Sequence, residues 1–80
     1  MVALEGWSEV EGALEREFRF DSFPDAIAFV NRLAELAEAA NHHPDIAVSY
    51  RRVTVRWATH SDSAITDRDR EMAERTNGLA

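Results

Sequence analysis

The feature that most constrains the fold of this chain is a long amphipathic segment with signals for a helix start before it and a helix end after it. From Phe23 to about Asn41, apolar residues recur at helical spacing. Asp21 or Ser22 can cap the start, and Pro24 is tolerated in the first turn. Pro44 disfavours helical geometry at the residue before it, so the helix must end near there. The sequence therefore predicts one long helix in the middle of the chain.

Two apolar stripes run along this predicted helix. The first contains Phe23, Ile27, Val30, Ala34 and Ala37, and the second contains Phe29, Leu33, Leu36 and Ala40. Together they cover about half of the helix circumference, whereas packing on one surface needs a stripe of about 100°. We therefore expect a second surface, such as another subunit, to pack against this helix.

Segments with alternating apolar and polar residues lie on both sides of the helix. Residues 7–11 and 13–20 predict a hairpin that turns at Gly12. After the helix, residues 45–50 and 52–58 alternate in the same way and predict two more strands.

A second, shorter helix is predicted to begin near Thr66. Its apolar face comprises Ile65, Met72, Ala73 and Thr76, and Asp69 falls on the same face. The order β-β-α-β-β-α predicts an α+β fold of two layers, with helices packed on one face of a four-stranded antiparallel sheet. Neither a repeat nor a linker interrupts the chain, so residues 1–80 are expected to form a single domain.

Composition narrows the classes of function and partner. The chain has 80 residues, no cysteine and a formal net charge of -6, which disfavours nucleic-acid binding even though Arg51, Arg52 and Arg56 lie close in sequence. No stretch has the length of a membrane span, so we expect a cytoplasmic protein without a membrane partner. Because so small a core has neither disulfides nor a thiolate metal site, subunit contacts are expected to add stability.

The candidate functional residues are the histidines His42, His43 and His60 with the carboxylates Glu38 and Asp69. Histidine gives or takes a proton near neutral pH, which suits general acid–base catalysis. Each residue also has a purely structural interpretation: a histidine can stabilise a helix C-terminus or end a strand in solvent, Glu38 can form a surface pair with His42, and Asp69 can complete a capping box. On these residues alone, both interpretations stay open.

A metal site fits the sequence less well. Three histidines and carboxylates could bind zinc, but adjacent histidines before a proline seldom point at one ion, and no His-x-x-x-His spacing occurs. The chain also has no nucleophile elbow and no glycine-rich phosphate loop. We therefore do not expect a metal site, a catalytic serine or a phosphate-binding loop.

The joint spacing of these residues resembles the signature of the pterin-4a-carbinolamine dehydratases. The matching positions are Gly6-Trp7, Phe18-Arg19-Phe20, Phe23, Glu38, His42-His43-Pro44, Tyr50, Thr59-His60, Thr66 and Asp69. The resemblance implies an antiparallel four-stranded sheet backed by helices, assembled as a homodimer or homotetramer. It also implies that a pterin is the substrate and that no cofactor is required.

The resemblance further implies the reaction and the roles of the residues. The reaction is the dehydration of 4a-hydroxytetrahydrobiopterin to quinonoid dihydropterin, which recycles tetrahydrobiopterin. His42 and His43 are expected to serve on one side of the pterin and His60 on the other. Glu38, Asp69 and Pro44 are expected to orient the imidazoles or bind the pterin.

Two departures from the family pattern and two alternatives accompany this interpretation. Family members usually carry a helix before Gly6, where this chain has five residues, and a Gly-Gly pair where it has Ser63-Ala64.

The alternatives are a non-catalytic dimerisation or assembly module of the same fold, and an enzyme that acts on another pterin.

Overall fold

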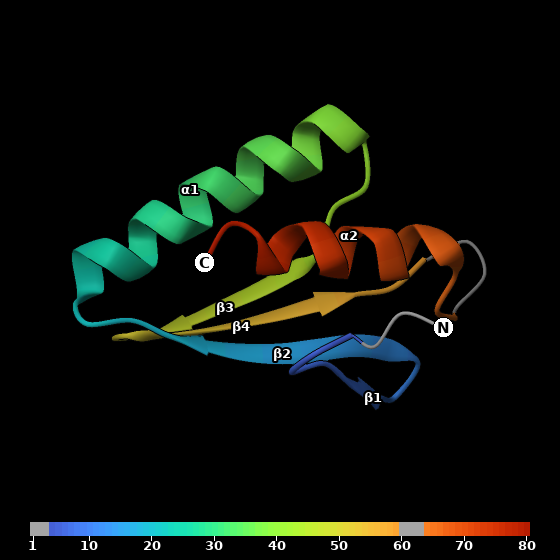
Figure 1. Ribbon diagram of the computed structural model, residues 1–80, viewed down its shortest axis with the longest axis horizontal. Coiled ribbons are helices and arrows are strands. Elements are labelled where there is room, and N and C mark those ends of the chain that lie inside the picture. The colour runs from blue at the N-terminus through green and yellow to red at the C-terminus, as the bar shows by residue number, and fades with distance from the viewer. Residues whose placement is uncertain (1–3, 60–63) are drawn as a thin grey trace.

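In the computed structural model, which describes residues 4–59 and 64–80, four strands form one antiparallel sheet and both helices lie on the same face of it (Figure 1). The strand order is β1-β2-β4-β3. The elements are β1 (Ser8–Val10), β2 (Ala13–Arg19), α1 (Phe23–Ala40), β3 (Asp45–Ser49), β4 (Arg52–Trp57) and α2 (Asp67–Asn77). The predicted fold class and element order are confirmed.

A two-residue turn joins β1 to β2. Glu11 and Gly12 both have positive φ, 48° and 78°, as in a type I′ turn, whose twist matches that of the strands it connects. Glycine adopts this geometry without steric cost. Because Glu11 belongs to the turn, the first strand ends at Val10, one residue earlier than the alternation predicts.

Side-chain and backbone caps fix both ends of α1. Of the two predicted N-caps it is Ser22 that acts, since its Oγ accepts a hydrogen bond from the N–H of Asp25 at 3.2 Å. At the other end Asn41 is left-handed, with φ 51°, and its N–H donates to the carbonyl of Glu38 at 3.2 Å. The helix therefore ends at Ala40, and the chain leaves the helix axis just before the histidine pair.

Only part of the apolar surface of α1 faces the core. Phe29 and Leu33, from the second predicted stripe, have 0% exposure, as does Ala26. Phe23, from the first stripe, is 47% exposed, and Val30 is only partly buried. The sheet thus leaves part of the apolar surface uncovered, as the width of the two stripes implies, and the expected second subunit stays a prediction.

The inner strand β4 carries the centre of the core. Val53, Val55 and Trp57 alternate toward the helices and have 0% exposure. Their partners on β2 complete the layer, since Phe18 is registered with Val53 and Leu14 with Trp57. The predicted alternation is confirmed.

β3 forms an exposed edge of the sheet. It pairs with β4 alone in the described sheet, and all five of its residues are exposed. Ile46 and Val48 are registered with Val55 and Val53 and so lie on the helix-covered face, yet they are 36% and 40% exposed. The helices pack over β2 and β4, so this apolar edge is left uncovered.

α2 buries the predicted stripe and one carboxylate. Met72, Ala73 and Thr76 are buried together with Asp69. Thr66 is the N-cap, in a capping box with Asp69. Within residues 4–59 and 64–80, neither helix has the length and hydropathy needed to cross a membrane.

Candidate functional site

His42 lies in the core at the exit of α1. The residue is 8% exposed, and its ring stacks on Trp57 with 5.3 Å between centroids and an interplanar angle of 26°. Its backbone N–H donates to the carbonyl of Ala37 at 3.1 Å, which ties it to the last turn of the helix. Its Nε2 lies 2.6 Å from Oδ1 of Asp69, a residue in the first turn of α2.

Asp69 is a fully buried carboxylate with several hydrogen-bond donors. Its Oδ2 accepts from the Oγ1 of Thr59 at 2.8 Å and from the backbone N–H of Thr66 at 2.9 Å. Burial by itself would raise the pKa of Asp69, but the hydrogen bonds from His42, Thr66 and Thr59 outweigh it and hold that pKa below the ordinary value of 3.8. Asp69 is therefore ionised at neutral pH.

The ionised Asp69 determines which proton His42 carries. A carboxylate has no proton to donate, so the 2.6 Å contact requires a hydrogen on Nε2 of His42. In the neutral ring Nδ1 is then the basic nitrogen. Asp69 makes both predicted kinds of contact, because its Oδ2 takes part in the capping box while its Oδ1 binds the imidazole of His42.

His43 has a different environment from its neighbour. Its side chain is 58% exposed, and its Nε2 lies 2.8 Å from Oε1 of Glu38, which is 81% exposed. The structure thus pairs Glu38 with His43, five residues on, whereas helical spacing suggested a pair with His42. The left-handed Asn41 ends the helix and breaks that spacing. Pro44 follows as a partly exposed residue before β3.

The third predicted histidine, His60, lies outside the described residues. Its neighbour Thr59 is described: it forms an isolated bridge with Ala64 and donates to Asp69. The structure therefore brings together Glu38 with His43, and His42 with Asp69.

Trp57 and Thr59 belong to the site although neither is among the predicted site residues. Trp57 is the platform under His42, and Thr59 binds the carboxylate that binds His42. Alternation predicted Trp57 to be buried, but not which ring it would contact. Thr59 immediately precedes His60 in the signature, and that position was the available signal.

The fold and this arrangement define a small α+β protein with two imidazole–carboxylate pairs beside one helix end. Among the described residues, no group of three His, Cys, Asp or Glu side chains could hold a metal ion. These imidazoles and carboxylates are suited to proton transfer and hydrogen bonding.

Comparison with known proteins identifies the family. The model of the family described as pterin 4 alpha carbinolamine dehydratase matches residues 1–79. The chain belongs to this family.

Several relatives are similar over most of their length. A protein of Mycolicibacterium vanbaalenii is 47% identical over 76 residues, covering 95% of this chain and 82% of the relative. One from Gloeobacter violaceus is 54% identical over 68 residues, covering 82% of this chain and 74% of the relative. Both are provisionally named pterin-4-alpha-carbinolamine dehydratases.

Solved structures share the fold, and two of them have described roles. A protein of Brucella melitensis described as a transcriptional coactivator/pterin dehydratase has a TM-score of 0.92 and 39% identity, covering 96% of this chain and 84% of that one. A pterin dehydratase-like protein identified as a RuBisCO assembly factor in the alpha-carboxysome has a TM-score of 0.77 and 25% identity, covering 92% and 86%. The fold therefore occurs with more than one described role.

Proposed function

We propose that this protein is a hydro-lyase that dehydrates 4a-hydroxytetrahydrobiopterin to quinonoid dihydropterin. The family membership and the two imidazole–carboxylate pairs support this assignment. The reaction removes the hydroxyl from C4a and the proton from N5 as one water molecule, so it needs an acid for the hydroxyl and a base for the proton. In the cell this step recycles tetrahydrobiopterin, in the cytoplasm and without a further cofactor.

One observation carries the proposal: two adjacent histidines are held by two carboxylates in unlike environments. His43 is exposed and can exchange protons with a bound pterin, with Glu38 orienting its ring. His42 is buried against Asp69, which keeps its Nε2 protonated and leaves Nδ1 to accept or return a proton. The exposed and the buried imidazole can therefore take different parts in the two proton transfers.

The remaining roles follow from the family signature. We assign His60 to the opposite side of the pterin from His42 and His43. Pro44 orients the chain beyond the histidine pair and contributes to substrate binding. Thr59, which donates to Asp69, links the strand before His60 to the buried pair.

The decisive test measures dehydration directly. Synthetic pterin-4a-carbinolamine is mixed with the wild-type protein in a stopped-flow instrument, and quinonoid dihydropterin formation is followed by absorbance. We expect a rate above that of the spontaneous reaction, increasing linearly with protein concentration. A rate equal to the spontaneous one would contradict the proposed activity.

A non-catalytic assembly role is the second candidate. The described role of the RuBisCO assembly factor, at a TM-score of 0.77, favours it for this fold. In that case the wild-type protein would bind another protein and leave the carbinolamine rate unchanged. An enzyme acting on a different pterin would be distinguished by testing further carbinolamines in the same assay.

We also propose that the chain forms a homodimer or homotetramer through the edge of β3. An unpaired strand edge offers backbone hydrogen bonds to a second chain, and β1, the other edge, has three residues against five in β3. Ile46 and Val48 supply exposed apolar side chains at this edge.

Val48→Lys is expected to lower the mass of the assembly, from dimer to monomer or from tetramer to dimer, because an edge lysine opposes strand pairing. Size-exclusion chromatography with light scattering measures the mass. Val10→Lys on β1 is the matched control, since Val10 is 36% exposed and Val48 is 40% exposed. A Val48→Lys protein with the wild-type mass, or a monomeric wild type, would contradict the β3 interface.

A further inference from the structure

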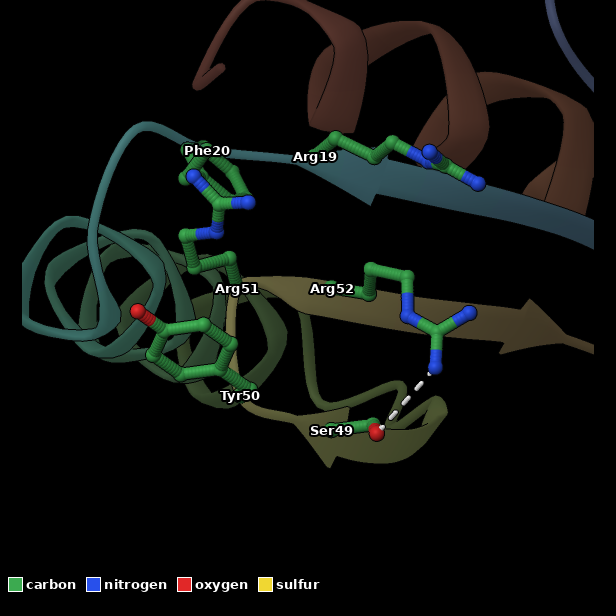
Figure 2. A pocket seen from close by; sticks show the side chains of 6 residues that line it. All are labelled: Arg19, Phe20, Ser49, Tyr50, Arg51 and Arg52. Atoms are coloured by element: carbon green, nitrogen blue, oxygen red, sulfur yellow. Dashed lines mark hydrogen bonds between the residues drawn. The ribbon is translucent and has the colours of Figure 1, made fainter.

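A cavity lined by arginines lies at the opposite end of β3 from the histidines. Its volume is about 420 Å³, and it opens where the β3–β4 turn meets the end of β2 (Figure 2). The residues that line it are Arg19, Phe20, Ser49, Tyr50, Arg51 and Arg52. The proposed dehydration uses none of these residues, and none of them is acidic.

Two of these arginines lie directly opposite each other on adjacent strands of the sheet. Arg19 of β2 and Arg52 of β4 are registered partners. They lie on the face away from the helices, because their chain neighbours Phe18 and Val53 are buried on the other face. Like charges directly opposite each other destabilise an antiparallel pair. The carboxylate of Glu17, which lies within 4.0 Å of both guanidiniums, offsets part of this repulsion, and a bound anion would offset more of it.

Neighbouring polar groups orient both guanidiniums. Glu17 accepts from Nε of Arg19 at 2.9 Å, and its other oxygen lies 4.0 Å from Nη1 of Arg52. Nη2 of Arg52 donates to Oγ of Ser49 at 3.4 Å. A guanidinium has five N–H donors, and these side chains are 75% and 52% exposed. Donors therefore remain for a ligand after these contacts are made.

A third arginine and an exposed ring lie at the turn. The guanidinium of Arg51 lies 5.2 Å from the ring centroid of Tyr50, which is 69% exposed. Tyr50 holds a positive φ of 55° in the turn, and the carbonyl of Arg51 accepts from the N–H of Phe20 at 3.0 Å. In Figure 2 the Tyr50 and Phe20 rings lie toward the turn, and the Arg19 and Arg52 guanidiniums lie further along the strands. The exposed ring of Tyr50 therefore lies beside positively charged arginine side chains at this turn.

We propose that this cavity binds a small phosphate monoester whose organic part carries a planar ring. Arginine guanidiniums bind phosphate oxygens through paired charge-assisted hydrogen bonds, which Arg19 and Arg52 are placed to supply. An aromatic side chain such as Tyr50 offers a stacking surface for the ring. The volume falls within the range of small-molecule sites, roughly 300–1,000 Å³. This site is separate from the histidines and does not depend on the proposed dehydration.

The test is a titration of the full chain at low ionic strength, where exposed charges are least screened. The probes are adenosine 5′-monophosphate, inorganic phosphate and adenosine, with binding followed by calorimetry and amide NMR shifts. We expect the nucleotide to bind most tightly, phosphate more weakly and adenosine least, with shifts at Arg19 and at residues 49–52.

Variants separate the phosphate contact from the ring contact. Arg52→Gln is expected to weaken nucleotide binding about tenfold or more, since it removes charge-assisted hydrogen bonds. Arg75→Gln, at an exposed position of α2, is the matched control and is expected to bind as wild type. Tyr50→Asn keeps a residue that tolerates positive φ and is expected to reduce nucleotide affinity to that of inorganic phosphate.

Three results would overturn the proposal. One is no binding of either phosphate-bearing probe, and another is wild-type affinity in Arg52→Gln. The third is tighter binding of a hexaglutamate peptide than of the nucleotide, which would assign the cavity to an acidic protein partner. The dehydration rate of Arg52→Gln is expected to equal that of wild type, so the failure of either proposal is recognised independently of the other.

Discussion

Asp69→Ala is expected to lower the free energy of unfolding by about 3–5 kcal/mol, because each buried donor left without its acceptor costs about 1–3 kcal/mol. The carboxylate accepts hydrogen bonds from His42, Thr59 and the N–H of Thr66, and its residue is fully buried. Removing it leaves these donors without this acceptor and removes one half of the capping box of α2. Small domains have total stabilities of about 5–15 kcal/mol, so this variant is expected to be partly unfolded.

Urea denaturation followed by tryptophan fluorescence and far-UV circular dichroism measures this loss. Asp67→Ala is the matched control: it removes a carboxylate from the same first turn, but one that is fully exposed and pairs with Arg70 at the surface. Exposed pairs contribute little to stability, so the control is expected to unfold close to wild type. Equal stabilities for the two variants would show that the hydrogen bonds of Asp69 do not hold α2 in place.

The lowered pKa of Asp69 makes the stability that this carboxylate contributes depend on pH. Because this pKa is lower in the folded protein than its ordinary value of 3.8, the unfolded state takes up the proton first as the pH falls. The stabilisation is thus complete above about pH 4–5, and it is lost as the pH falls through 3.8 toward the folded-state pKa. In Asp69→Asn the decline of stability with acid is expected to be shallower than in wild type, whereas Asp67→Asn keeps the wild-type slope.

The fold could be predicted because its elements have strong periodicities and clear end signals. The alternation of Val53, Val55 and Trp57 predicted a buried face, and these side chains have 0% exposure. Individual ends shifted by one residue where backbone geometry decided them, as at Glu11 and Asn41, whose positive φ values lie outside strand and helix. Asparagine tolerates positive φ and commonly ends helices, whereas nothing in the alternating pattern marks Glu11 as a turn residue.

The sequence predicted which residues form the site better than it predicted which of their side chains contact each other. Spacing along a helix suggested Glu38 as a partner of His42, but that argument holds only while the helix continues. The contact between His42 and Asp69 joins residues 27 positions apart, through the packing of α2 on the sheet. Periodicity placed Asp69 on the buried face, and only the three-dimensional packing shows that its second oxygen binds an imidazole.

His43→Gln is expected to lower kcat for carbinolamine dehydration about 10²–10⁴-fold, the range supplied by general acid–base catalysis. Glutamine keeps a polar side chain of similar size but does not exchange a proton at neutral pH. Because His43 is largely exposed and contacts Glu38 at the surface, the substitution leaves the core untouched. The loss is therefore expected in the chemical step while the urea midpoint stays at the wild-type value.

Two carboxylates of α1, Glu38 and Glu35, provide a matched pair of variants for this prediction. Glu38→Gln removes the acceptor that orients His43 and is expected to lower kcat less than His43→Gln does. Glu35→Gln, at an exposed position three residues earlier, is expected to retain the wild-type rate. Because the reaction needs both an acid and a base, His60→Ala is expected to lower kcat as well. If His43→Ala and His60→Ala both dehydrated the carbinolamine at the wild-type rate, the proton transfers would have to be assigned to other groups.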